Sequence, residues 1–184
     1  MNYSRLGLMI RSIYLVFLIL CAGKLHAHQP DLSSIMLYEQ NGKRLFVMKS
    51  SLTAYEGEID FQFGKNAYKT PEEFRQLVSR RFETTCQISV NNEKIKFRNI
   101  VVILGHETTL FAELENAPSK ITSLYLKNTF FKDIPGSQCE LILSANGAPQ
   151  KQYILSNANR QQVKLIFQNA GWVVDESNWS FFGQ

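Results

Sequence analysis

The chain has 184 residues and a formal net charge of +4, with 20 lysines and arginines against 16 aspartates and glutamates. Arg5, Arg11 and Lys24 account for three of the basic residues, and residues 1–27 contain no acidic residue, so residues 28–184 carry 17 basic and 16 acidic side chains. A near-neutral chain without a dense run of lysine and arginine lacks the charge pattern of nucleic-acid-binding proteins, so we expect no nucleic-acid partner.

Residues 1–27 have the three parts of a cleavable secretory signal peptide. Arg5 and Arg11 are followed by an apolar run over residues 13–22, and a short polar stretch ends at the small residue Ala27. This run is shorter than the roughly 20 residues that a membrane-spanning helix needs. We predict export to a periplasmic or secreted location, with no transmembrane span after cleavage; an uncleaved anchor is the alternative.

Three maturation products compete. Cleavage after Ala27, which we favour, starts the mature chain at His28 and leaves one domain over residues 28–184. Cleavage after Gly23 would also place a small residue at the cut. Lipidation of Cys21 would tether the protein to a membrane, although Leu20 before it fits a lipobox poorly.

The first part of the predicted domain alternates apolar and polar residues, as half-buried strands do. Residues 34–40 and 43–50 flank Asn41-Gly42, a pair that suits the type I′ turn of a β-hairpin. The apolar residues between positions 51 and 64 follow no single period, which leaves this segment without an assignment.

Three carboxylates alternate within the unassigned segment, at Glu56, Glu58 and Asp60. They have the form of a catalytic carboxylate cluster. We interpret them instead as the solvated face of a strand or irregular segment, with Ile59 and Phe61 directed inward.

A helix is predicted from residue 70 onward. Thr70 suits the N-cap, Pro71 the first helical position, and Glu73 completes a capping box. Side chains at helical spacing form a stripe that we expect to face a core, and the apolar stem of its one charged residue would cover neighbours. The stripe consists of Phe74, Leu77, Val78, Arg81 and Phe82.

Short alternating segments separated by turns return after this helix. They cover residues 86–90, 95–104, 109–114, 121–127, 139–144, 151–155 and 163–167. This pattern predicts a mainly β fold, an antiparallel β-sandwich of immunoglobulin-like type with one helix in a connection.

Two cysteines remain once Cys21 leaves with the predicted signal, an even number in an oxidising compartment. Cys86 and Cys139 each alternate with apolar residues, so both face inward if their segments are strands. We predict a buried Cys86–Cys139 disulfide, which would stabilise the fold by about 4 kcal/mol by closing a long loop. Two reduced, buried thiols are the alternative.

Three short stretches together resemble a known family. They are residues 28–31, which lead into a strand, residues 104–109 around His106, and residues 128–134 ahead of the strand from Cys139. They resemble uncharacterised secreted β-sandwich proteins and the soluble N-terminal region of some hydrogenase/urease-accessory (HupE/UreJ-type) metal permeases. The resemblance implies an extracytoplasmic sandwich linked to metals. Because no transmembrane helix follows in this sequence, we expect no transport role.

Histidine carries the candidate metal chemistry. Cleavage after Ala27 would make His28 the mature N-terminus, whose amine and imidazole can chelate one metal ion, and His106 would add a third nitrogen. Imidazole suits copper and zinc, and copper-binding β-sandwich proteins assemble such a set as a histidine brace. Asp31 or Glu107 would supply a further ligand or a supporting hydrogen bond. In the alternative interpretation His28 only follows a cleavage site and His106 is a hydrogen-bonding turn residue.

No catalytic motif is recognisable in the sequence. Nucleophilic catalysis needs a serine or cysteine with a histidine and an acid, and the chain has no Gly-x-Ser-x-Gly elbow, Gly-rich phosphate loop or Cys-x-x-Cys motif. We expect a non-enzymatic binding or accessory protein without a cofactor, whose partner is a protein, such as a component of a membrane-associated system. A metal-binding protein that holds copper is the alternative.

The protein recovered from its export compartment is expected to begin at His28 and to be lighter by the two hydrogens of one disulfide. An intact mass under denaturing conditions, with and without reduction, measures both. A lipidated Cys21 or a different first residue would contradict the predicted cleavage, and two alkylatable thiols would contradict the disulfide.

Overall fold

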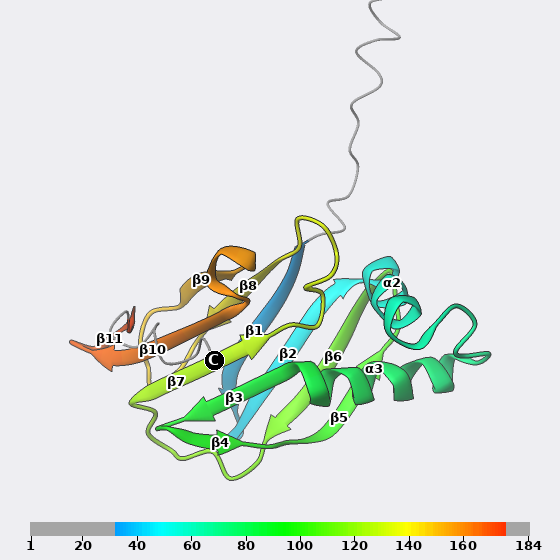
Figure 1. Cartoon of the computed structure of the whole chain (residues 1–184). Helices are drawn as coiled ribbons and strands as arrows, with labels where there is room; N and C mark the ends of the chain where they lie inside the picture. The colour runs from blue at the N-terminus through cyan, green and yellow to red at the C-terminus, as the bar shows by residue number, and fades with distance from the viewer. Residues whose placement is uncertain (1–31, 176–184) are drawn as a thin grey trace, which may run out of the picture.

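Two β-sheets and two α-helices form residues 32–175, the part of the chain that the computed structural model describes (Figure 1). The predicted signal peptide, His28 and residues 176–184 lie outside the described residues. Within residues 32–175, no helix combines the length and apolar character needed to cross a membrane. The strands are β1 (Leu32–Gln40), β2 (Lys43–Ser51), β3 (Cys86–Val90), β4 (Glu93–Ile95), β5 (Phe97–Ile103), β6 (Glu107–Leu114), β7 (Ser123–Asn128), β8 (Gln138–Leu143), β9 (Lys151–Leu155), β10 (Gln162–Gln168) and β11 (Gly171–Val174). The helices are α2 (Leu52–Phe63) and α3 (Pro71–Thr85), with a short 3-10 helix η1 (Asn157–Asn159).

The strands form two layers. Sheet A has the order β5-β6-β2-β1-β8-β9, and sheet B has the order β11-β10-β7-β3-β4. All pairings are antiparallel except that of β1 with β8, which is parallel. Figure 1 shows sheet B and α3 side by side in one layer, with sheet A forming the other. The predicted mainly β, sandwich-like fold is confirmed.

The two strongest local predictions are also confirmed. Asn41 and Gly42 both have positive φ, 52° and 73°, as the type I′ turn between β1 and β2 requires. At the start of α3, the Glu73 amide donates to the Thr70 hydroxyl over 3.2 Å, and the Glu73 carboxylate accepts from the Thr70 amide over 3.3 Å. These contacts satisfy backbone donors that a helix N-terminus leaves unpaired.

Aromatic side chains attach α3 to sheet A. The ring of Phe82 lies 5.2 Å from Phe46 of β2 and 4.6 Å from Phe97 of β5, measured between centroids. Phe46 and Phe97 also meet edge to face at 5.1 Å. Tilted and edge-on pairs of this kind add to the stabilisation that burial alone provides. The predicted apolar stripe therefore does face the core, and α3 runs directly into β3 beside it.

A second helix, α2, occupies the segment that the sequence pattern left unassigned. The Ser51 hydroxyl caps it by accepting from the Ala54 amide over 3.1 Å. The interpretation of a solvated strand face with Phe61 inward is wrong: Glu58 is 1% exposed and Phe61 is 67% exposed. A helical period brings Tyr55, Glu58 and Ile59 to one buried face and turns Phe61 away from it.

The single strand predicted over residues 95–104 is two strands in different sheets. β4 ends at Ile95 on the edge of sheet B, and β5 begins at Phe97 on the edge of sheet A. Lys96 alone connects them. Apolar residues at positions 95, 97 and 100–104 concealed this crossing, because nothing in the run marks the point at which the chain changes sheets.

The two cysteines face the space between the sheets, as predicted. Cys86 of sheet B and Cys139 of sheet A are each 3% exposed. Asn128, which pairs with Cys86 across β3 and β7, donates its side-chain amide to the Cys139 sulfur over 3.6 Å. Both cysteines are free thiols in the structure, so the disulfide remains a prediction.

The assignment of α2 is tested by comparing Ile59→Ala with Phe61→Ala. Because Ile59 is fully buried, its truncation is expected to lower the free energy of unfolding by about 2–5 kcal/mol. Truncation of exposed Phe61 is expected to change it by no more than about 0.5 kcal/mol. Urea denaturation measures both, and comparable losses would restore the strand interpretation, in which both side chains point inward.

Candidate functional site

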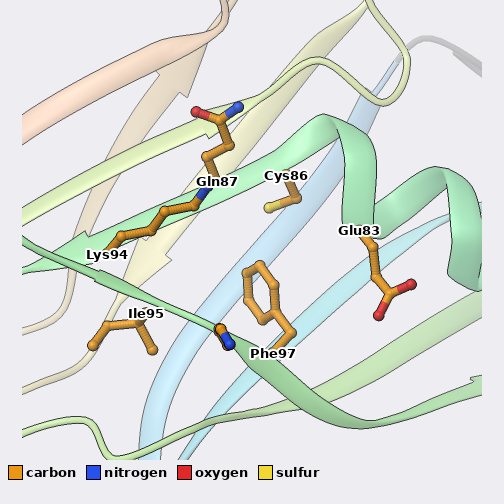
Figure 2. A pocket seen from close by; sticks show the side chains of 7 residues that line it. Glu83, Cys86, Gln87, Lys94, Ile95 and Phe97 are labelled. Atoms are coloured by element: carbon orange, nitrogen blue, oxygen red, sulfur yellow. The ribbon is translucent and has the colours of Figure 1, made fainter.

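A pocket of about 440 Å³ opens where the chain passes from sheet B to sheet A, and we name it the β4–β5 pocket. One wall is the end of α3 and the start of β3, and the other is the β4–β5 crossing (Figure 2). Its lining residues are Glu83, Cys86, Gln87, Lys94, Ile95, Lys96 and Phe97. Pockets that hold small molecules commonly measure about 300–1,000 Å³.

The inner part of the β4–β5 pocket is apolar. Cys86 is 3% and Ile95 8% exposed, and Phe97 is partly buried against the core aromatic rings. Figure 2 shows the Cys86 and Phe97 side chains pointing toward one another across the space between β3 and the β4–β5 crossing. A ligand entering here would therefore meet apolar surface continuous with the core.

The rim of the β4–β5 pocket is polar and carries an excess of positive charge. Lys94, Lys96, Glu83 and Gln87 are all exposed. Within residues 32–175, neither lysine ammonium group forms an ion pair, and neither does the Glu83 carboxylate. The rim thus presents two ammonium groups and one carboxylate that are available to a ligand.

The thiol that lines the β4–β5 pocket is held in its protonated form. Burial raises the pKa of the Cys86 thiol well above its usual value, and the nearby Cys139 raises it further. Because the thiolate rather than the thiol is the nucleophile, Cys86 is inert at neutral pH. No histidine lines the pocket that would take its proton. The arrangement suits binding better than covalent catalysis.

His106, a predicted metal ligand, lies at one end of sheet A. It lines a second pocket of about 320 Å³ with Glu107, Glu140 and Lys49, next to Leu32 at the start of β1. Lys49 pairs with the Glu107 carboxylate at 3.1 Å. Among residues 32–175, no group of three or more histidine, cysteine, aspartate or glutamate side chains is arranged to hold a metal.

The other predicted ligands of the metal site, His28 and Asp31, lie outside the described residues. His28 is four positions before Leu32, and a chain of four residues spans at most about 14 Å when extended. His28 is therefore within chain reach of the pocket that His106 lines. The histidine brace itself stays a prediction.

A buried ion pair between the two helices was missed by the sequence analysis. Glu58 of α2 accepts from Arg81 of α3 through one oxygen, Oε1, over 2.7 Å from Nε and 2.6 Å from Nη2. The second oxygen, Oε2, is buried and has no hydrogen-bond partner among the described residues. The signal was Arg81 itself, a cation on an otherwise apolar stripe, since a partly buried cation needs a counter-charge.

The surroundings of Glu58 place its titration near neutral pH. Burial raises the pKa of Glu58 to about 7, which outweighs the lowering by the Arg81 guanidinium. Of the adjacent charged residues, Asp133 raises this pKa further and Lys132 lowers it. Perturbed carboxylates are common at functional sites but also occur in structural ion pairs. Glu58 lines none of the pockets described above, so we assign it a structural role that depends on pH.

No family model matches the chain, and no curated protein gives a significant match. The site is therefore interpreted from its own geometry. The resemblance to the soluble region of HupE/UreJ-type proteins stays an expectation.

The role of Glu58 is tested by Glu58→Gln, which removes the titrating group and keeps the side-chain size. Because folding raises this pKa from 4.5 to about 7, the stability that the protonated carboxyl contributes is fully present below pH 4.5 and is lost as pH rises through 7. Between about pH 5 and pH 8, the free energy of unfolding of the native protein is expected to fall relative to that of Glu58→Gln.

Urea denaturation at several pH values measures this difference, and the constant cost of leaving Arg81 unpaired cancels in the comparison. Glu72→Gln, which changes a carboxylate that is 67% exposed, is the control for removing one surface charge. Parallel pH profiles for the native protein and Glu58→Gln would contradict the assignment.

Proposed function

We propose that this chain is an exported, non-enzymatic binding protein whose ligand occupies the β4–β5 pocket, and that it acts as an accessory to a membrane-associated system. Export rests on the three-part signal over residues 1–27. The accessory role rests on the resemblance to the soluble region of HupE/UreJ-type proteins.

The observation that carries the binding proposal is the combination of features in the β4–β5 pocket. It joins an apolar interior at Cys86, Ile95 and Phe97 to charged groups on its rim that form no ion pair among residues 32–175. Apolar walls with a few placed polar groups are the usual composition of a small-molecule site. The rim also lies on both sheets, so that a bound molecule would contact α3, β3 and the crossing segment together.

Two further observations favour binding over catalysis. The buried Cys86 thiol stays protonated at neutral pH, and the residues lining the β4–β5 pocket include no histidine. His106 lies in the second pocket, whose lining residues include no cysteine. The sequence-based expectation of a non-enzymatic protein is therefore retained as part of the proposal.

Native mass spectrometry of the protein purified gently from its export compartment tests the binding function. We expect a bound organic molecule that leaves on denaturation. Gln87→Trp places a large ring at the pocket rim and is expected to abolish the adduct, because Gln87 is exposed and lines the pocket. Gln152→Trp, the same change at an exposed position of β9 in sheet A, is the control.

An adduct on the native protein and on Gln152→Trp, but not on Gln87→Trp, would support the β4–β5 pocket as the ligand site. An adduct that persists in Gln87→Trp would contradict this location. Ligand-free protein from three independent purifications would contradict the proposed function.

A metal site at the His106 end of sheet A is the second candidate function. The supporting observation is that His106, Glu107 and Glu140 line one pocket beside Leu32, within chain reach of His28. Imidazole and amine nitrogens favour Cu(II), and a carboxylate oxygen would complete the ligand set. Copper would then be held between the mature N-terminus and the start of β6 in sheet A.

The copper hypothesis predicts one Cu(II) per mature chain that begins at His28. His106→Ala is expected to weaken binding by about tenfold or more, and one extra residue before His28 is expected to weaken it at least as much. Competition against a copper-chelating dye measures the affinities. An affinity that is unchanged by either modification would eliminate the brace.

A further inference from the structure

We propose that the β4–β5 pocket takes a small amphipathic anion, a molecule with one apolar chain and a terminal carboxylate. This inference rests on the proposed binding function and specifies the chemical class of its ligand. The distribution of charge and apolar surface around the pocket opening indicates this class of ligand.

The anionic group of the ligand is indicated by the two lysines of the rim. Lys94 and Lys96 stand on either side of Ile95, and neither has an ion-pair partner among residues 32–175. Ammonium groups form short, strong hydrogen bonds with carboxylates. Because both lysines are exposed, a carboxylate at the rim would bind them while remaining at the solvent boundary.

Glu83 indicates that the ligand carries one negative charge rather than two. Its carboxylate lies on the α3 wall of the same opening, opposite the crossing segment (Figure 2). Two ammonium groups and one carboxylate leave a net charge of +1 at the rim, which one negative group on the ligand neutralises. A dianionic phosphate would face additional repulsion from Glu83, because like charges at close range disfavour each other.

The apolar chain of the ligand is indicated by the interior of the pocket. Beyond the rim, the surface consists of Ile95, Cys86 and the ring of Phe97, which packs on Phe82. Removing an alkyl chain from water onto such surface is favourable roughly in proportion to the apolar area that is buried. A polar metabolite without an apolar part would leave this surface unused.

A peptide that adds a strand to sheet B is the main competing ligand, since β4 is an edge strand. However, β4 has only three residues, Glu93–Ile95, which offers few backbone groups for strand addition. Lys96 leaves the sheet immediately afterwards as the chain crosses to β5. The geometry therefore favours a small molecule over a peptide strand.

The experiment is an NMR and calorimetric titration of the complete mature protein with sodium decanoate, below the concentration at which it forms micelles. Acetate has the same carboxylate without the alkyl chain. Decyltrimethylammonium keeps the chain with a positive head group, and decyl maltoside keeps it with an uncharged one. We expect one-to-one binding of decanoate, with amide shifts centred on residues 83–87 and 94–97, and no comparable binding of the other three probes.

Two pairs of variants locate the binding. The double change Lys94→Gln and Lys96→Gln is expected to weaken decanoate binding by about tenfold or more. Lys120→Gln with Lys151→Gln removes the same charge from exposed positions outside the pocket and is expected to leave the affinity unchanged. Far-UV circular dichroism spectra of both double variants that match the wild-type spectrum establish that each is folded.

Equal binding of decanoate to both double variants, or equal binding of the cationic amphiphile, would overturn the proposed ligand class. If the native protein carries a pocket ligand that is not an amphipathic anion, the binding function stands and this inference fails. If neither a natural adduct nor any probe occupies the pocket, both fail. Shifts confined to β4 on adding an extended peptide would replace the small anion with a peptide ligand.

Discussion

The packing of Phe82 against Phe46 and Phe97 positions both walls of the β4–β5 pocket. Phe82 lies near the end of α3, which continues without a loop into β3, while Phe97 is the first residue of β5. Phe46 of β2 anchors both rings to the centre of sheet A. One aromatic cluster therefore sets the distance between the α3–β3 wall and the β4–β5 crossing. A change in that cluster would alter the pocket without touching its rim.

The C-terminal part of α3, next to Phe82, is also held by α2. The Glu58–Arg81 ion pair joins the two helices, and Tyr55 of α2 packs edge-on against Phe130 and Phe131 at 5.3 and 5.1 Å between centroids. The Tyr55 hydroxyl donates to the Met48 carbonyl oxygen over 3.3 Å, which ties α2 to β2. Because Glu58 titrates near pH 7, the strength of this attachment changes across neutral pH. Arg81 is two positions before Glu83 of the pocket wall, so this ion pair lies at the pocket end of α3.

The features that the sequence predicted correctly are those whose causes are local. Thr70 and Glu73 satisfy each other's backbone groups within one turn, and Asn41-Gly42 adopts the positive φ values that its turn needs. The alternation of inward and outward residues likewise revealed most strands and the inward direction of both cysteines. These signals depend on neighbours in the chain, so one sequence is sufficient to read them.

The features that the sequence did not predict depend on contacts between distant segments. Glu58 is buried because Arg81, 23 positions later, supplies its counter-charge. The β4–β5 pocket exists because Lys96 carries the chain from one sheet to the other, which alternation alone does not reveal. His106, singled out as a candidate metal ligand, lies exposed in the bend before β6, but its relation to His28 lies outside the described residues. The position of α2 and the crossing between the two sheets were the missing information.

Amide NMR of the mature protein, recorded with any molecule that co-purifies with it, locates the ligand site most directly. The sample is compared before and after that molecule is stripped by unfolding and refolding, and then with the molecule returned. We predict reversible shifts confined to residues 83–87 and 94–97, with little change at the His106 end of sheet A. Shifts centred instead on residues 49–51 and 105–107, or none at all, would contradict the assignment of the β4–β5 pocket as the ligand site.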